Sequence, residues 1–394
     1  MIRRPVVALL VLLGAATVSA RAAPITTDHP KVELVTIGIG ALAWERHGHI
    51  AICVTENGLR SSVVHDAPGD RCFNYGNADF EHPLTMASGF VRGTHSFWVT
   101  QDLPWQLWHQ YRVTDRTIWA QELPLDAAQK TKLIAKLEDD VVDAHRYYAY
   151  DHFTDNCTTR IRDILDDVTD HSLSKMTEPT GAKTFRDYAR DGFYGMRTPL
   201  VIADLIMGRS TDRVPTYWER MFLPQYLREA VETEWGVHPT VVYERKECIG
   251  DSEPSCVVRG VPAVKDPGSG RCALALVIVV LTAPVWLSRW LGKFQRTGLA
   301  ISIIPYWLFG VALTALAIVS PLPYFRINEV ILVWFPLDLA ILFLPREWKV
   351  KYARARIVML AAIAVLLLVG VLRQPLWAPM LWPLIPMATV AFRD

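Results

Sequence analysis

Net charge is almost absent from this chain. Its 394 residues include 41 lysines and arginines against 40 aspartates and glutamates, which gives a formal net charge of +1. Such a balance provides no general electrostatic attraction to nucleic acid or to an acidic substrate. We therefore expect no nucleic-acid partner, and the sequence likewise predicts no cofactor and no metal site. The length allows two or three domains.

Long hydrophobic runs are missing between the N-terminal segment and about Gly270, and they dominate the chain after that point. Residues 1–23 have a basic start, a short apolar run and small residues at Ala20 and Ala22, which is the pattern of a secretory signal peptide. An uncleaved anchor is the alternative. Either one delivers the next segment, predicted as a folded domain over residues 24–245, to the far side of a membrane.

Cysteine is scarce, with six in the chain. Thiols outside the cytoplasm can oxidise, so two disulfides are conceivable. Cys248 and Cys256 bracket a polar loop in the predicted linker over residues 246–271 and are the first candidates. Cys53 and Cys72 are the second pair, across neighbouring strands.

Two cysteines are left over. Cys272 begins an apolar span and is expected to face lipid or other helices. Cys157 has no natural partner, which fits a reactive role.

Cys157 stands at the predicted start of a helix. Asp155 or Asn156 can cap that start, and apolar residues follow at helical spacing. A thiol at the positive end of the helix macrodipole is favoured as the thiolate, the form that attacks carbonyl carbon. The alternative interpretation is that Cys157 is the first buried residue of an apolar stripe.

The chain before the cysteine is predicted to be mostly strands. These strands cover Val32 to Ile39, Ile50 to Thr55, Ser61 to His65, about Arg71 to Tyr75, Phe90 to Val99 and Thr117 to Leu123. A helix is predicted to open at the capping box of Asp126 and Gln129. After the cysteine, helices are predicted from Leu200 to Met207 and from Trp218 to Val231, either as core or as a gate for a lipid substrate.

His47 and His49 stand two residues apart at the start of a predicted strand, so their side chains are expected on one face. Either imidazole can serve as the general base for a thiol. A third group must orient that base, and a neighbouring strand is its natural place. The eligible residues are Asp70, Asn74, Tyr75 and Asp79, with plain turn chemistry as the alternative. The aromatic stripe of Trp105, Trp108 and Tyr111 is predicted as core packing, with an acyl-binding role as the alternative.

These residues carry a family resemblance. Gly48-His49, Asn74-Tyr75-Gly76, Arg92-Gly93 and Asn156-Cys157-Thr158-Thr159-Arg160, with Asp70, Asp79-Phe80, Arg116, Gln121 and Met221 to Pro224, together resemble the periplasmic domain of Lnb-type lipoprotein N-acyltransferases. The resemblance covers most of residues 31 to 240. It implies an α+β domain with a circularly permuted papain-like, NlpC-related fold, followed by an all-α membrane domain of five helices.

The resemblance also implies a reaction. Cys157 would take a fatty acyl chain from a membrane phospholipid as a thioester, with His49 as its base. The α-amino group of a lipoprotein N-terminus would then accept the chain. Arg160, Arg92 and Arg116 are the predicted substrate-binding residues. Backbone N–H groups at the helix start, helped by the Asn156 side chain, are expected to stabilise the oxyanion.

The predicted membrane domain covers residues 272–394 and holds five apolar runs near the length a crossing helix needs. They are Ala273 to Leu291, Leu299 to Ser320, Val330 to Leu344, Ile357 to Leu372 and Leu376 to Phe392. The third carries Asp338, either a site or a polar contact between helices. Two basic loops, around Lys293 and from Arg346 to Arg356, predict the cytoplasmic side. The expected location is the bacterial inner membrane, with the catalytic domain in the periplasm.

Two other functions compete with acyl transfer. A thiol hydrolase acting on cell-wall peptides or phospholipid would use the same two side chains, with the membrane domain as a tether. A non-catalytic membrane scaffold is the third interpretation. Five crossings disfavour a simple tether, and the intact Cys157 and His49 disfavour a scaffold.

Overall fold

The computed structural model describes residues 30–392, apart from residues 41, 60–66, 68, 80–81, 194–195 and 247–268. The predicted signal peptide, the predicted strand from Ser61 to His65, and the predicted pair of Cys248 and Cys256 lie outside the described residues.

A seven-stranded antiparallel sheet forms the centre of the N-terminal part, in the order β6-β4-β3-β2-β1-β5-β7. The strands are β1 Lys31–Ile37, β2 His49–Thr55, β3 Arg71–Asn77, β4 Ser96–Asp102, β5 Ile118–Glu122, β6 Tyr147–Ala149 and β7 Thr240–Tyr243. The strand predicted from Phe90 to Val99 is wrong in its first half. Helix α1 (Pro83–Val91) includes the first two residues of that half, because proline at the first helical position favours a helix start and Gly93, at φ +63°, ends the helix; β4 begins only at Ser96.

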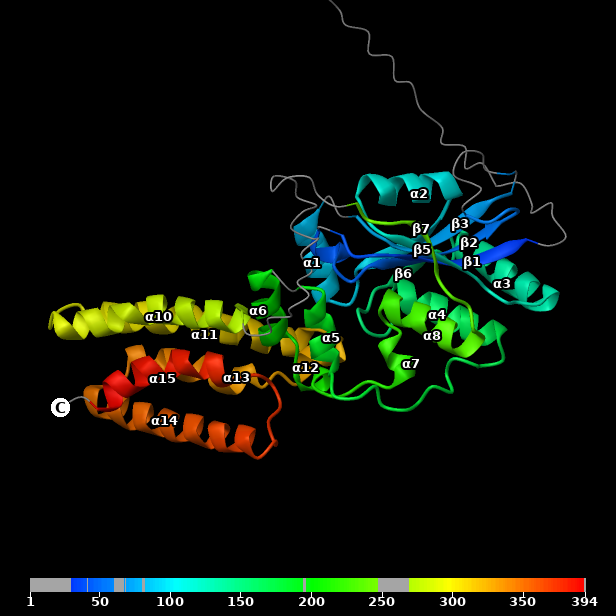
Figure 1. The fold of residues 1–394 in the computed structure, drawn as a ribbon. Coiled ribbons are helices and arrows are strands. Elements are labelled where there is room, and N and C mark those ends of the chain that lie inside the picture. The colour runs from blue at the N-terminus through cyan, green and yellow to red at the C-terminus, as the bar shows by residue number, and fades with distance from the viewer. Residues whose placement is uncertain are drawn as a thin grey trace, which may run out of the picture.

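Helices cover both faces of the sheet (Figure 1). Helix α2 (Pro104–Val113) packs on one face over an apolar cluster that includes Val35, Ala51 and Cys53. The other face carries the larger core, formed with α3 (Ala127–Asp140), α4 (Cys157–Val168) and α8 (Pro224–Trp235). Alternate residues of a strand point to opposite faces, so each central strand is buried on both sides. The predicted capping box of Asp126 and Gln129 opens α3.

A disulfide joins Cys53 of β2 to Cys72 of β3, at positions directly opposite each other in the sheet. This confirms the second of the two predicted pairs. The bond closes a separation of 19 residues, for which loop-closure entropy gives about 3 kcal/mol of stabilisation. It ties together the two strands that carry His49 and Asn74.

The C-terminal part is helical. Its elements are α10 Ser269–Trp290, α11 Gln295–Val319, α12 Pro323–Arg326, α13 Val330–Val333, η4 Pro336–Leu342, α14 Arg346–Leu368 and α15 Trp377–Ala391. Two stretches, Cys272–Trp290 and Gln295–Val319, are long and apolar enough to cross a membrane by length and composition. The helix α15 is a shorter apolar helix.

The third predicted crossing, Val330 to Leu344, is not a continuous α-helix. It consists of the short helix α13 and the 3-10 segment η4, which begins at Pro336, a residue that cannot continue a helix ladder. Asp338 of η4 is fully buried. Its carboxylate accepts hydrogen bonds from Tyr306 and Tyr352 at 3.1 and 2.8 Å, and from Arg356 at 2.7 and 3.0 Å. Asp338 is therefore a polar contact between helices.

The predicted basic loop from Arg346 to Arg356 is also corrected, because these residues form the first turns of α14. Arg354 donates to the carbonyl of Ala391 in α15. Arg289 of α10 donates to the carbonyl of Thr389, so three segments meet at one end of the helical part. Figure 1 shows that this end, with the C-terminus, points away from the sheet.

The opposite end of the helical part is joined to the sheet domain by hydrogen bonds. The Asn328 amide donates to the carbonyls of Leu205 and Ile206, and the Gln374 amide donates to the carbonyl of Met207. The Glu329 carboxylate also accepts from the backbone N–H of Gln374 at this end. Farther along the chain, Asp338 of η4 binds Arg356 of α14, so this segment runs along the helical part without forming a long helix.

Short helices fill the seam between the two parts. They are α5 Phe185–Asp191, α6 Arg197–Ile206, η3 Arg209–Thr211 and α7 Tyr217–Arg220. An aromatic cluster crosses this seam, joining Phe153, Phe185 and Phe222 to Tyr324 and Phe325. The helix predicted from Leu200 to Met207 corresponds to α6, and the one predicted from Trp218 to Val231 is divided between α7 and α8.

Candidate active site

Cys157 is the first residue of α4, and Asn156 is its N-cap. The Asn156 Oδ1 accepts hydrogen bonds from the backbone N–H of Thr158 at 2.8 Å and of Thr159 at 3.0 Å. Both amide hydrogens of Asn156 are also engaged, with the carbonyls of His152 and Phe222 at 2.7 and 3.0 Å. The Asn156 side chain therefore fixes the helix start under the sulfur, and the expectation that it helps bind an oxyanion is wrong.

His49 is the first residue of β2. The residue before it is glycine because a side chain there would clash. Gly48 has φ +82°, and a Cβ at this position would lie 2.8 Å from the carbonyl oxygen of Ile37. The His49 Nε2 is hydrogen-bonded to Asn74 Oδ1. The Asn74 Nδ2 donates to Asp102 Oδ2 at 3.3 Å, which turns the amide oxygen toward the imidazole. Nε2 is therefore the protonated nitrogen, and Nδ1 is left as the basic one.

The imidazole and the thiol meet at Gly76. A Cβ built on this glycine would lie 3.2 Å from the Cβ of Cys157 and 3.7 Å from Cε1 of His49. Gly76 has φ +90° and lies in a bulge of β3 between Asn74 and Asn77. Because glycine has no side chain, the helix start and the strand end approach each other closely here. A general base and a nucleophile thus lie on either side of one residue.

His47 lies elsewhere. It precedes the strand, and Gly48 turns the chain, so the expectation that both histidines share one face is wrong. The His47 Nε2 donates to the carbonyl of Ala189 at 2.8 Å, and its ring packs edge-on against His152 and Phe193. His49 is therefore the histidine that the structure brings to the cysteine.

Three of the four residues considered for orienting the base have other partners. The Asp70 carboxylate accepts from the backbone N–H of Glu56 and of Ala67 at 2.7 and 3.1 Å, at the opposite end of β3. The Tyr75 hydroxyl donates to Asp140 at 2.8 Å in the core. Asp79 is exposed and pairs with His82 at 2.8 Å. Asn74 alone of the four holds His49.

The predicted substrate-binding arginines lie in three different settings. Arg160 forms a two-point ion pair with Asp155, at 2.7 and 3.0 Å, and its guanidinium lies 3.9 Å over the ring of Tyr148. Arg92 is exposed at the end of α1, and a Cβ on the adjacent Gly93 would lie 2.6 Å from Pro321, so this turn touches the helical part.

Arg116 is the arginine buried next to the site. Its Nε donates to the carbonyl of Gly38 at 2.8 Å, and its Nη1 donates to Glu45 of the 3-10 turn η1 (Ala43–Glu45) at 3.4 Å. Its Nη2 is buried without a hydrogen-bond partner among the described residues. A role for the three arginines in substrate binding stays a prediction.

Burial sets the protonation of the pair. It raises the pKa of the Cys157 thiol above its ordinary value, although Thr158, the N–H groups of the helix start and Arg116 oppose the shift. Burial also lowers the pKa of His49 to about 4; the Asn74 hydrogen bond opposes this shift and the charge of Arg116 adds to it. Both groups are therefore neutral at neutral pH. The expectation that the helix dipole makes Cys157 a resting thiolate is wrong, because desolvation outweighs it.

Comparison with known proteins finds one family similarity. Residues 22–190 match the family described as the Lnb N-terminal periplasmic domain. Over these residues the chain is similar to that family. The resemblance inferred from the sequence is thereby confirmed. No curated protein and no solved structure matches the chain.

Because Cys157 and His49 are both neutral at rest, the reaction of Cys157 with an alkylating agent should depend on pH. Alkylation of Cys157 by iodoacetamide requires the thiolate, so its rate should rise about tenfold per pH unit from about pH 6 to about pH 8. The measurement is the mass of the Cys157 peptide after timed labelling, with the exposed Cys272 as an internal reference. A rate that is flat over this range would instead show a preformed thiolate–imidazolium pair.

Sequence reasoning missed that three residues lie at the site. Asp102 holds Asn74 and ends β4, but its place became visible only with the β3–β4 pairing. Tyr111 of α2 has its ring centre 5.9 Å from that of His49, so one member of the aromatic stripe faces the site. Tyr148 of β6 has its hydroxyl 3.8 Å from a Cβ built on Gly76. The place of Gly76 could have been inferred. Ala51 pairs with Asn74, and two residues farther along the same β2–β3 register Gly76 stands opposite His49.

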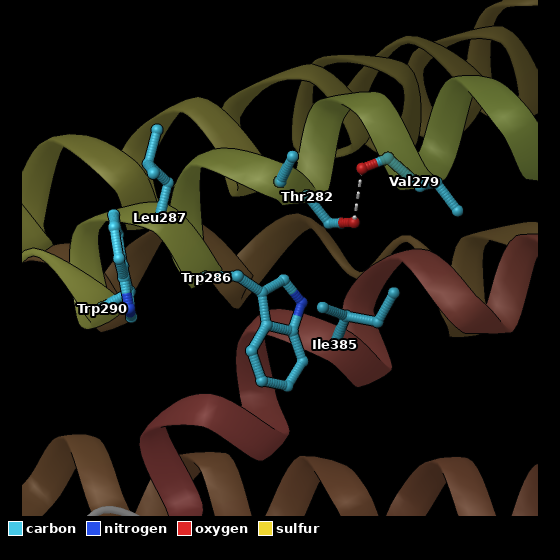
Figure 2. Close-up of a pocket in the computed structure, with 7 residues that line it drawn as sticks. Val279, Thr282, Trp286, Leu287, Trp290 and Ile385 are labelled. Carbon is cyan, nitrogen blue, oxygen red and sulfur yellow. Dashed lines mark hydrogen bonds between the residues drawn. The ribbon is translucent and has the colours of Figure 1, made fainter.

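Three cavities lie outside the Cys157–His49 pair. One of about 470 Å³ lies in the helical part, where Val279, Thr282 and Trp286 of α10 face Ile385 of α15 (Figure 2). A second, of about 380 Å³, lies beside His47 and Arg228, and a third, of about 460 Å³, lies at the seam. None of the three is lined by Cys157 or His49, so the cavity in Figure 2 is separate from the candidate active site.

Proposed function

We propose that this protein is a membrane-bound cysteine acyltransferase that moves a fatty acyl chain from a phospholipid to the α-amino group of a lipoprotein N-terminus. The observation that carries the proposal is the meeting of Cys157 and His49 at Gly76, with Asn74 fixing the imidazole. The Lnb family match over residues 22–190 supports the same conclusion. The arrangement of a histidine strand before a cysteine helix is consistent with the permuted papain-like fold, which we retain as part of the proposal.

The first half-reaction forms a thioester. His49 Nδ1 takes the proton of the thiol as the sulfur attacks the ester carbonyl, so a C–S bond forms and the carbonyl π electrons move to oxygen. Collapse of the tetrahedral adduct breaks the C–O bond of the ester. The imidazolium returns its proton to the departing oxygen, which releases a lysophospholipid. Because both groups are neutral at rest, proton transfer accompanies the attack.

The second half-reaction uses an amine. A free α-amino group attacks the thioester, His49 accepts its proton, and the sulfur leaves as the thiol. Amines attack thioesters more readily than oxygen esters, which is the reason for a cysteine at this position. Water would hydrolyse the same intermediate, so the burial of the site serves transfer. The Nη2 of Arg116, which finds no hydrogen-bond partner in the described part of the chain, supports a role for this arginine in binding the donor phosphate.

The location is part of the proposal. Two stretches of the helical part qualify as membrane spans, and the segment from α13 through η4 runs along the same bundle. With α14 and α15, we infer five traverses, and this inference is supported by the basic ends of α10 and α14, which meet the C-terminal segment at the end away from the sheet. By the positive-inside rule we infer a multi-pass protein of the bacterial inner membrane, with its sheet domain in the periplasm.

A thiol hydrolase remains the second candidate, because the same Cys157–His49 pair would support attack by water. One experiment separates the two. The purified full-length protein is incubated with a phospholipid labelled in its acyl chains and with a synthetic diacylated lipopeptide that has a free N-terminal amine. We expect the label on that amine, and none on a matched lipopeptide whose amine is acetylated. Label recovered as free fatty acid with both lipopeptides would reject acyl transfer and favour the hydrolase.

A further inference from the structure

Three tyrosines lie close enough to Cys157 to feel a charge there, two of them buried and Tyr150 half-buried. They are Tyr111 of α2, Tyr148 of β6 and Tyr150, and a negative charge at Cys157 acts on all three hydroxyls. Two of these hydroxyls have partners. Tyr111 is hydrogen-bonded to Asn74, and Tyr150 lies 3.3 Å from Nδ1 of His152. The Tyr148 hydroxyl is buried without a partner among the described residues.

A buried hydroxyl without a partner is costly, so its presence beside a nucleophile calls for a function. The Tyr148 side chain is 6% exposed. Its hydroxyl lies 3.8 Å from a Cβ built on Gly76, and the Cβ of Cys157 lies 3.2 Å from the same point. Since glycine leaves that point empty, the Tyr148 hydroxyl and the Cβ that carries the sulfur of Cys157 border the same small space. A carbonyl carbon attacked by this sulfur would bring its oxygen within reach of the hydroxyl.

The surroundings hold Tyr148 in this position as a neutral donor. Its strand pairs with β4, where Phe97 is its direct neighbour. The Arg160 guanidinium lies 3.9 Å over its ring and is itself fixed by the two-point ion pair with Asp155. Burial raises the pKa of Tyr148 well above its ordinary value, so the hydroxyl keeps its proton. Arg160 thereby helps to hold the Tyr148 ring in place.

We propose that the Tyr148 hydroxyl is a catalytic residue that donates a hydrogen bond to the carbonyl oxygen of the acyl ester as Cys157 attacks it. Other donors at the helix start are engaged, since the Thr158 and Thr159 N–H groups donate to Asn156 Oδ1 and the Asn156 amide donates to the carbonyls of His152 and Phe222. The inference rests on the proposed acyl chemistry of Cys157, and it adds the group that receives the negative charge.

The test compares two single-atom deletions, Tyr148→Phe and Tyr150→Phe, in the full-length protein. The substrate is a p-nitrophenyl acyl ester, which reports acylation of Cys157 without requiring the natural lipid. Tyr148→Phe should lower kcat by roughly a hundredfold to a thousandfold with little change in KM, as for loss of one oxyanion donor. Tyr150→Phe, whose hydroxyl has a partner, should stay within about threefold. An unchanged kcat in Tyr148→Phe would overturn the assignment.

A second readout separates an oxyanion donor from a residue that merely shapes the site. Alkylation of Cys157 by iodoacetamide proceeds at a saturated carbon, so no oxyanion develops. Its rate should be the same in Tyr148→Phe and in the wild type. An equal loss in both reactions would overturn the assignment, because Tyr148 would then act on the thiol or on folding. If the protein reacted with the p-nitrophenyl ester but not with phospholipid, the result would count against the proposed function and not against the role of Tyr148.

Discussion

Replacing Cys157 by alanine is expected to abolish transfer of the labelled acyl chain, with a loss of roughly a thousandfold to a millionfold. The reason is covalent. Without the sulfur no thioester forms, and the remaining groups can only bind and polarise the ester. The measurement is the rate at which label reaches the amine of the lipopeptide acceptor.

The matched control is Cys272→Ala, which removes the exposed free cysteine at the start of α10. It should retain full activity. The Cys157→Ala protein should also be recovered in the membrane fraction and have the melting temperature of the wild type, since the thiol is one small group of a large core. Transfer at more than about a hundredth of the wild-type rate would show that the acyl chain does not pass through this sulfur.

Replacing His49 by glutamine is expected to lower kcat/KM for acyl transfer by roughly a hundredfold to ten-thousandfold, the range of a general base. Glutamine keeps a polar side chain opposite Asn74 but cannot take up the thiol proton. The same substitution at His47 is the matched control, because His47 donates to the Ala189 carbonyl and has no place beside Cys157. It should change kcat/KM by less than about fivefold.

The two histidine variants also distinguish a base from a structural residue. If His49 serves as the base during attack on the ester, iodoacetamide alkylation of Cys157 in the His49→Gln protein should keep its wild-type rate and pH dependence while acyl transfer falls, because alkylation uses the thiolate that solvent generates. A His47→Gln protein as inactive as His49→Gln, or more so, would contradict the assignment of the base.

The start of α4 could be predicted from the sequence because its causes are local. Asn156 caps the helix, and the residues after Cys157 repeat at helical spacing, so neither feature depends on distant parts of the chain. The same holds for β2, where Gly48 is required by the backbone at φ +82°. The close approach at Gly76 follows from the alignment of β2 with β3. Pairing Cys53 with Cys72 fixes that alignment, and it places Gly76 opposite His49.

The remainder of the site depends on contacts between distant segments. Asp102 reaches Asn74 only because β4 pairs with β3, and Tyr148 reaches Gly76 only because β6 pairs with β4. The protonation of Cys157 was mispredicted for a related reason. The helix dipole can be inferred from the sequence, whereas the desolvation that opposes it comes from elements packed around the sulfur.

The segment from Val330 to Leu344 shows a different limit. Its composition resembles that of a crossing helix, but Pro336 and the buried Asp338 require another backbone. The partners that satisfy Asp338 come from α11 and α14, so the sequence alone offered a choice between a site and a helix contact. Only the three-dimensional arrangement decided for the contact.

The central claim is that the acyl chain is carried on the sulfur of Cys157. The most direct measurement is the mass of the Cys157 peptide after the full-length protein has been incubated with a phospholipid of defined acyl chains, without acceptor. The account predicts one acyl chain on Cys157, removable by hydroxylamine and lost when the lipopeptide amine is added. An unmodified Cys157 in protein that goes on to acylate the added amine would contradict it.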